Sequence, residues 1–151
     1  MAKARKTARE KLEGKKDLPK IVDTPKGRML VPNPLDVDGL MRKVGRGRLV
    51  TVSQIREHLA GDFEAEWTCP MTTGIFIRIA AEAAEEDLCT GRGEPTPYWR
   101  VLKQDGGLNE KFPGGVEQQA VRLIEEGHII EERKGKKPPR VKDFEKSLQE
   151  I

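Results

Sequence analysis

The side chains best suited to nucleophilic or metal chemistry are two cysteines and two histidines: Cys69, Cys89, His58 and His128. A helix N-terminus stabilises a thiolate, and Cys69 directly precedes Pro70, where a helix is expected to begin. The residues beside Cys69 offer no base, so a buried structural cysteine is favoured over a nucleophile. No spacing among the four residues matches a zinc site. We predict reduced cysteines, no metal site and no cofactor.

A second group suited to chemistry is the aromatic pair Tyr98 and Trp99, followed by Arg100. Aromatic faces stack on nucleic-acid bases and contribute about 1–3 kcal/mol per base. Tyr98 and Trp99 therefore fit a pocket for a flipped base, with Arg100 against a phosphate. The alternative is that the two rings fill the core and that Arg100 forms an ordinary ion pair.

Two hydroxyls follow Pro70 at the expected start of a long helix. Thr72 and Thr73 could bring their hydroxyls and the helix dipole to phosphates, or could simply cap the first turn. Farther along, the same helix has one cation, Arg78, and then the acidic run 82–87. DNA would repel these acids if they faced it, which is the strongest argument in the sequence against DNA binding.

The net charge of +3 is unevenly distributed along the chain. Residues 1–20 have a net charge of +5 and residues 131–142 of +4, so the remainder is −6. Basic ends suit a polyanionic partner through counterion release, although they also serve solubility alone. No apolar run approaches the roughly 18 residues of a membrane span. We expect a cytoplasmic protein that does not enter membranes.

Periodicity and turn residues predict a mostly helical α+β fold, winged-helix-like, with a small β-hairpin wing. Residues 1–28 are charged and aperiodic, and we expect a flexible basic arm with some helix around residues 8–12. The folded domain should cover 29–151. Its first two helices, beginning at N-caps Asp36 and Ser53, are close enough in sequence for part of a helix-turn-helix.

Four further elements complete the expected domain. A helix should run from Pro70 into the acidic stretch and another over 116–126, ending at Gly127. Segments 128–130 and 140–141 flank a basic run, 133–137, which predicts a hairpin with a charged tip. That tip would contact DNA as a wing or remain a solvated turn. A last short helix is expected around 144–148.

Several short motifs occur in the order found in the alkylguanine-DNA alkyltransferases. They are Pro97-Tyr98-Trp99-Arg100-Val101, Asp105-Gly106, Gly114-Gly115 and Leu123-Ile124-Glu125-Glu126-Gly127, preceded by Gly47-Arg48-Leu49-Val50-Thr51 and Gln54-Ile55. Over roughly residues 36–128 the chain therefore resembles the DNA-binding half of that family.

The departures from the family pattern concern its reactive groups. The resemblance puts the family's alkyl-accepting cysteine at Tyr98 and its activating histidine at Trp99, and leaves only Glu126 of the Cys-His-Glu relay. A phenol and an indole that only donates cannot replace a thiolate and its base. The family's phosphate-rotating tyrosine falls on Val52 and its intercalating arginine on Met71. Met71 would remain an apolar wedge between base steps.

The resemblance to the alkyltransferase-like subgroup, which lacks the cysteine, implies a non-enzymatic DNA-binding protein that senses damaged or extrahelical bases in repair. Its partners would be duplex DNA, read in the minor groove or at a lesion, and a repair protein. The alternative function is a protein interaction module that keeps the alkyltransferase fold without its activity. A third hypothesis is a true alkyltransferase that uses Cys69. The residues expected at DNA are Thr51, Ser53, Gln54, Met71, Thr72, Thr73, Tyr98, Trp99, Arg100, Gly114 and Gly115.

Overall fold

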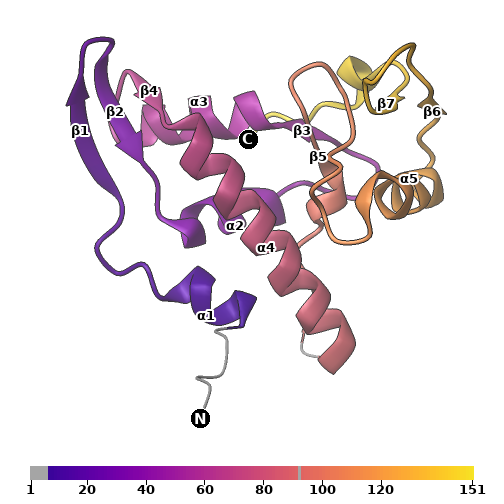
Figure 1. The fold of residues 1–151 in the computed structure, drawn as a ribbon, viewed down its shortest axis with the longest axis horizontal. Coiled ribbons are helices and arrows are strands. Elements are labelled where there is room, and N and C mark those ends of the chain that lie inside the picture. Colours follow the sequence, from indigo (N-terminus) through magenta and orange to yellow (C-terminus); the bar gives the residue numbers. More distant parts are fainter. Residues whose placement is uncertain (1–6, 92) are drawn as a thin grey trace.

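The computed structural model describes residues 7–91 and 93–151. These residues form an α+β fold of five α-helices and three small sheets, as expected from the sequence (Figure 1). The helices are α1 (Ala8–Glu13), α2 (Pro34–Arg42), α3 (Val52–Asp62), α4 (Pro70–Thr90) and α5 (Gly115–Glu125). The strands are β1 (Lys20–Thr24), β2 (Gly27–Val31), β3 (Val50–Thr51), β4 (Trp67–Thr68), β5 (Val101–Leu102), β6 (Ile130–Glu131) and β7 (Arg140–Val141). Two 3₁₀ turns occupy Tyr98–Arg100 and Phe144–Ser147.

The N-caps of α2 and α3 lie three and two residues, respectively, before the caps expected from the sequence. Asn33, and not Asp36, caps α2, because its side chain accepts a hydrogen bond from the Leu35 amide at 2.9 Å. Thr51, and not Ser53, caps α3 in a reciprocal capping box with Gln54. Both true caps lie in extended backbone just before the first helical residue, which is the geometry that a cap requires.

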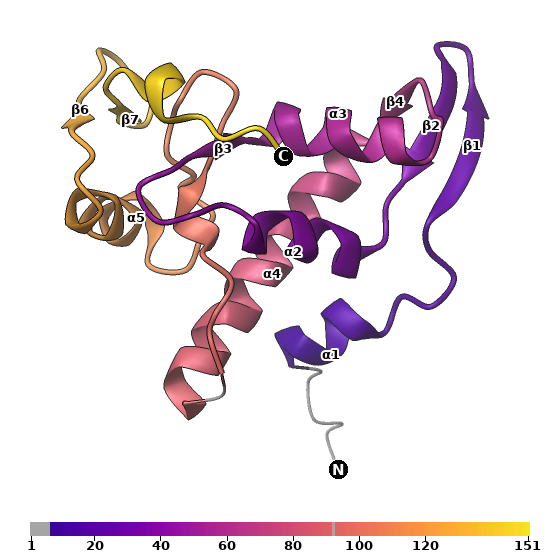
Figure 2. The same cartoon turned by 180° about the vertical axis from the view of Figure 1, so that it is seen from behind.

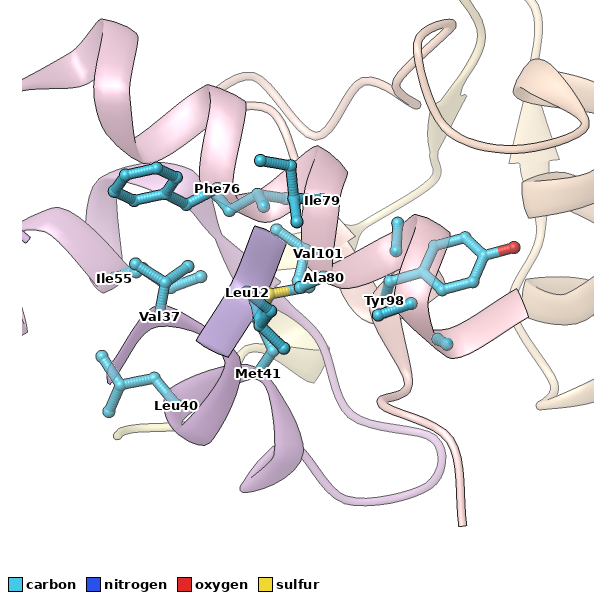
Figure 3. Close-up of a cluster of buried hydrophobic side chains, with 14 of the residues drawn as sticks. Leu12, Val37, Leu40, Met41, Ile55, Phe76, Ile79, Ala80, Tyr98 and Val101 are labelled. Carbon is cyan, nitrogen blue, oxygen red and sulfur yellow. The ribbon is translucent and has the colours of Figure 1, made fainter. Parts of the chain in front are cut away.

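Helix α4 is the central element, and the main core is built around it. It begins at Pro70 and ends at Gly91, whose φ of +68° closes the helix in the left-handed region. Its inner face changes from large residues, such as Phe76 and Ile77, to the small pairs Ala80–Ala81 and Ala83–Ala84, all buried. Figure 3 shows side chains from α1, α2, α3 and α4 meeting in this core.

Three small sheets fix the connections between the helices. β1 and β2 pair antiparallel, and β4 adds to β2 in parallel. β3 and β5 pair in parallel, with Thr51 opposite Leu102, which brings the start of α3 beside the turn after β5. β6 and β7 form the expected antiparallel hairpin. None of the helices in 7–91 and 93–151 is long and apolar enough to cross a membrane.

The segment 7–28 is ordered, which corrects the expectation of a flexible arm from residue 1 to 28. Helix α1 packs on α4 with Leu12 fully buried, and the Glu86 carboxylate accepts a hydrogen bond from the Ala8 amide at 2.7 Å. Arg9 forms an ion pair with the buried Asp87. Residues 1–6 lie outside the described residues. Local sequence did not reveal this docking because the contacts span almost 80 positions along the chain.

A smaller second core lies under the hairpin formed by β6 and β7. It joins five fully buried side chains, Leu49, Leu102, Leu108, Leu123 and Val141. The turn after β5 is tied to the hairpin by backbone bonds from Leu108 to Pro139 and from Val141 to Gly106. The hairpin is thus held rigidly against the β5 turn.

Candidate nucleic-acid interface

The first half of α4 forms a ridge on one face of the molecule, in front of α2 in Figure 1 and behind it in Figure 2. Met71 and Ile75 project from the ridge with exposed fractions of 75% and 42%. Beside the ridge lies a groove of about 370 Å³, which we call the α4 groove. Its lining comes from α4 and from the segment after β5: Pro70, Met71, Gly74, Ile75, Arg78, Lys103, Asn109, Glu110 and Lys111.

The α4 groove combines apolar side chains with three cations, Arg78, Lys103 and Lys111. Two of these cations have acidic neighbours. Lys103 pairs with Glu110 at 3.1 Å, and Arg78 lies 3.9 Å from Glu82. All four side chains are more than a third exposed, and pairs of this kind contribute only about 0–1 kcal/mol. A phosphate can therefore compete for both cations.

The hydroxyls of Thr72 and Thr73 are engaged within the first turn of α4. Buried Thr73 donates to the Cys69 carbonyl at 2.7 Å, so it is unavailable to DNA, contrary to the expectation. Thr72 donates to the Cys69 sulfur at 3.1 Å but remains partly exposed. The side chain next to the Cys69 sulfur is a hydroxyl and not a base, which gives no support to Cys69 as a nucleophile.

The three residues expected from the start of α3 have different environments. Thr51 is buried and Gln54 donates to the Gln149 carbonyl at 3.0 Å, so both serve the fold. Ser53 is half-buried and lines a second hollow of about 290 Å³ together with Arg56 and Gln104. Because Gln104 follows Lys103, this hollow and the α4 groove adjoin the same turn.

Tyr98 belongs to the core, which corrects its assignment to a base-stacking pocket. Its exposed fraction is 0%, and its ring packs edge-on against Trp99 and Phe112. In Figure 3 its hydroxyl points away from the other labelled side chains. The hydroxyl donates to Glu85 at 2.5 Å. Burial, followed by this hydrogen bond and the Glu85 charge, raises the pKa of Tyr98. No face of the ring is open to a base.

Trp99, Arg100 and Glu126 form a closed network where the family's relay would lie. The Glu126 carboxylate accepts hydrogen bonds from Trp99 Nε1 at 2.8 Å, from the Arg100 guanidinium at 2.9 Å and from the Gly47 amide at 3.0 Å. Burial alone would raise the pKa of Glu126, but these donors lower it below its ordinary value. Arg100 also donates to the Val44 carbonyl at 2.6 Å. Arg100 is thereby committed to the fold, which corrects its expected role at a phosphate.

The Gly114–Gly115 pair makes the turn into α5. Both have positive φ, +77° and +69°, and a Cβ on Gly114 would lie 2.6 Å from that of Gln118. The Gly115 amide donates to the Phe112 carbonyl at 2.8 Å. The turn into α5 thus explains why glycine occupies both positions, independently of any contact with DNA.

The acidic end of α4 is used inside the molecule. Glu86 and Asp87 hold α1, and Glu85 accepts from Tyr98 and, at 3.1 Å, from Arg122. Arg122 in turn lies over the Trp99 ring, 4.6 Å from its centroid. These three carboxylates are therefore engaged by other parts of the fold, while Glu82, earlier in the same acidic run, stays partly exposed beside Arg78.

The hairpin presents its cations near the β5 turn. Arg133 donates to Asp105 at 2.6 Å and to the Pro138 carbonyl at 2.7 Å, and its hydrogen bond lowers the pKa of Asp105. The exposed lysines at the tip are Lys134, Lys136 and Lys137. The structure thus holds this basic tip against the turn that also carries Lys103.

Sequence reasoning missed Ile75, Lys103 and Lys111 as lining residues of the α4 groove. Two signals were available. Ile75 lies one helical turn after Met71 and on the same face, and Lys103 is the first residue after the buried strand β5. Local sequence did not show that the segment after β5 would lie alongside α4.

No family model matches the sequence, and no curated protein matches it either. Among solved structures, the chain is similar to S. pombe Atl1, whose structure was determined in complex with damaged DNA containing O6-carboxymethylguanine. The TM-score is 0.53 and the identity 15%, over 78% of this chain and 94% of that chain. The two proteins share a fold, and the alkyltransferase-like fold expected from the motifs is therefore confirmed.

Proposed function

We propose that this protein binds DNA over the α4 ridge and performs no alkyl transfer. The observation that carries the proposal is the α4 groove, an open hollow in which exposed apolar side chains lie among three cations. The shared fold supports the proposal, because Atl1 was solved on damaged DNA. The ordered packing of the acidic end of α4 supports it as well, since those charges are neutralised internally.

The chemistry of Tyr98 and Trp99 supports the proposal that the protein transfers no alkyl group. A buried phenol with a raised pKa is a poor nucleophile. The neighbouring indole donates a hydrogen bond to Glu126 and has no nitrogen lone pair with which to accept a proton as a base. Neither Tyr98 nor Trp99 can therefore start a displacement on an alkylated base.

The proposed binding mode divides the work between two kinds of side chain. Arg78, Lys103 and Lys111 would contact phosphates and supply affinity that does not depend on sequence. Met71 and Ile75 would lie against the bases as apolar wedges, which favours duplexes that open easily at a lesion or mismatch. Preference for a damaged or extrahelical base would then come from the ease of unstacking.

The test is a fluorescence anisotropy titration of a duplex, with and without one O6-alkylguanine, at several salt concentrations. Lys103→Gln should weaken binding to both duplexes and reduce the salt slope by about 1, as expected for one lost phosphate contact. Lys43→Gln is the matched control, because Lys43 directly follows α2, which lies in front of α4 in Figure 2 and thus on the opposite side from the ridge. Wild-type protein that binds neither duplex at low salt would refute the proposal.

A further inference from the structure

A second and larger groove lies on the other side of the α4 ridge. Its volume is about 580 Å³, within the range of about 300–1,000 Å³ typical of ligand sites. Leu18 and Val31 line it from the N-terminal side, and Ile75, Phe76 and Ile79 from α4. We call it the N-terminal groove, because the ordered segment 8–31 forms its outer wall.

The rim of the N-terminal groove is rich in lysine. Lys11, Lys15 and Lys20 line it, and none of them forms an ion pair within the described part of the chain. Glu10 and Asp17 are also on the rim, so the lining has one net positive charge. An apolar floor beneath uncommitted ammonium groups suits a ligand that is flat and apolar in one part and anionic in another.

The N-terminal groove and the α4 groove share one lining residue, Ile75. The two hollows thus lie on either side of one exposed side chain on the ridge. A nucleic-acid strand held by Arg78 and Lys103 in the α4 groove can cross Ile75 and reach Lys15 and Lys20 without leaving the protein surface.

We propose that the N-terminal groove receives an unpaired nucleotide of the bound DNA, with its base on the apolar floor and its phosphate at Lys15 and Lys20. The inference rests on the proposed function and adds a second subsite to it. A nucleotide has the required composition, a flat base of low polarity joined to an anion. Nothing in the motifs of this chain pointed to this groove, because its outer wall was expected to be a flexible arm.

The experiment compares a duplex carrying one bulged nucleotide with the fully paired duplex, by anisotropy at several salt concentrations. The wild-type protein should prefer the bulge, and Lys15→Gln/Lys20→Gln should lose the preference with a salt slope lower by about 0.7–0.9 per lysine. The matched control is Lys16→Gln/Lys43→Gln, which removes the same charge outside the groove. It should keep the bulge preference.

A fluorescent base analogue at the bulge provides a second readout. Its emission should shift to the blue on binding the wild-type protein and should not shift with Val31→Asn, which makes the floor polar. Equal behaviour of the two lysine double variants, or no blue shift with wild type, overturns the inference. If Lys103→Gln still weakens binding in that case, the proposed function survives and the groove is left to a protein segment. No DNA binding at all overturns both.

Discussion

At the scale of single residues, the side chains from Tyr98 to Arg100 serve the fold. Tyr98 donates to Glu85, while Trp99 and Arg100 donate to Glu126. Each of these side chains thus has a buried or half-buried partner. The burial of Glu126 accounts for part of this arrangement, because a carboxylate with 5% side-chain exposure must be matched by donors.

Replacing Glu126 with glutamine tests this network. Glu126→Gln leaves the Arg100 guanidinium, 13% exposed, without its charge partner, and should lower the free energy of unfolding by about 3 kcal/mol at neutral pH. Since folding lowers the pKa of Glu126, the wild-type advantage is full above about pH 4.5 and is lost as the pH falls through the folded value. Urea unfolding at several pH values measures the loss of stability and its pH dependence. Glu125→Gln, at an exposed neighbouring position, is the control.

Tyr98 is the single tyrosine of the chain, so tyrosinate absorbance reports on it alone. Because burial and Glu85 raise its pKa, the folded protein should show no phenolate near pH 10, where the unfolded chain ionises. The stability from the neutral phenol is therefore complete below about pH 10 and declines as the pH rises further. Tyr98→Phe should lack this alkaline decline, cost about 1.5 kcal/mol at neutral pH and leave DNA affinity unchanged. Weaker DNA binding by this variant would mean that the Tyr98 hydroxyl, and not only Glu85, has a partner in the DNA.

At the scale of elements, the helix starts determine where polar side chains point. The Thr51 hydroxyl and the Gln54 side-chain oxygen both accept hydrogen bonds in the capping box of α3, whereas the Ser53 side chain lines a hollow. A threonine followed three residues later by glutamine is a capping-box signature. The sequence thus held the correct signal, two residues before the cap that we expected.

The two candidate caps are separable by mutation. Thr51→Ala should lower the free energy of unfolding by about 1 kcal/mol, because it removes the oxygen that accepts the Gln54 amide. Ser53→Ala should change it by less than about 0.5 kcal/mol. Thermal or urea unfolding of both variants measures the two losses of stability. A larger loss for Ser53→Ala than for Thr51→Ala would contradict the assigned cap.

Helix α1 is the element in which the structure departs most from the fold expected from the sequence. Leu12→Ala should lower the free energy of unfolding by about 2–5 kcal/mol, because it opens a cavity between α1 and α4. The neighbouring exposed Lys11→Ala should have little effect. Urea titration, combined with limited proteolysis after Arg9 or Lys11, would detect the loosened helix. Equal stability of the two variants would instead restore the interpretation of a flexible arm.

At the scale of the whole molecule, cations border the grooves on both sides of the α4 ridge, while Glu85, Glu86 and Asp87 at the end of α4 bond to other elements of the fold. Groups from both sides of the ridge, Lys103 and Lys111 on one and Lys15 and Lys20 on the other, border the two grooves. This distribution explains how a chain with a net charge of only +3 can present a surface suited to a polyanion.

The proposed lack of alkyl transfer concerns the whole protein, and intact-mass analysis tests it. Incubation with an O6-methylguanine oligonucleotide should add no methyl group, because no thiol of the described residues lies with a base at the relay position. The Cys69→Ser variant should bind the oligonucleotide as wild type does. An added methyl mass that disappears in Cys69→Ser would establish transfer by Cys69.

The sequence by itself determined the local elements and their order. Pro70 placed the start of α4, and the acidic stretch that follows its apolar half was correctly included in the helix. The motifs from Pro97 to Gly127 indicated the fold that the comparison with Atl1 then confirmed. These features depend on contacts between near neighbours, which a linear pattern records.

Only the tertiary structure decided which groups remain free to bind. Tyr98 and Arg100 have the right chemistry for DNA, yet hydrogen-bond partners in other elements of the fold already engage them. The acids of α4 likewise find partners in α1 and α5, and the expected flexible arm becomes the wall of a groove. A hydrogen bond or a hollow belongs to two segments at once, so its presence is fixed by packing between residues far apart in the chain.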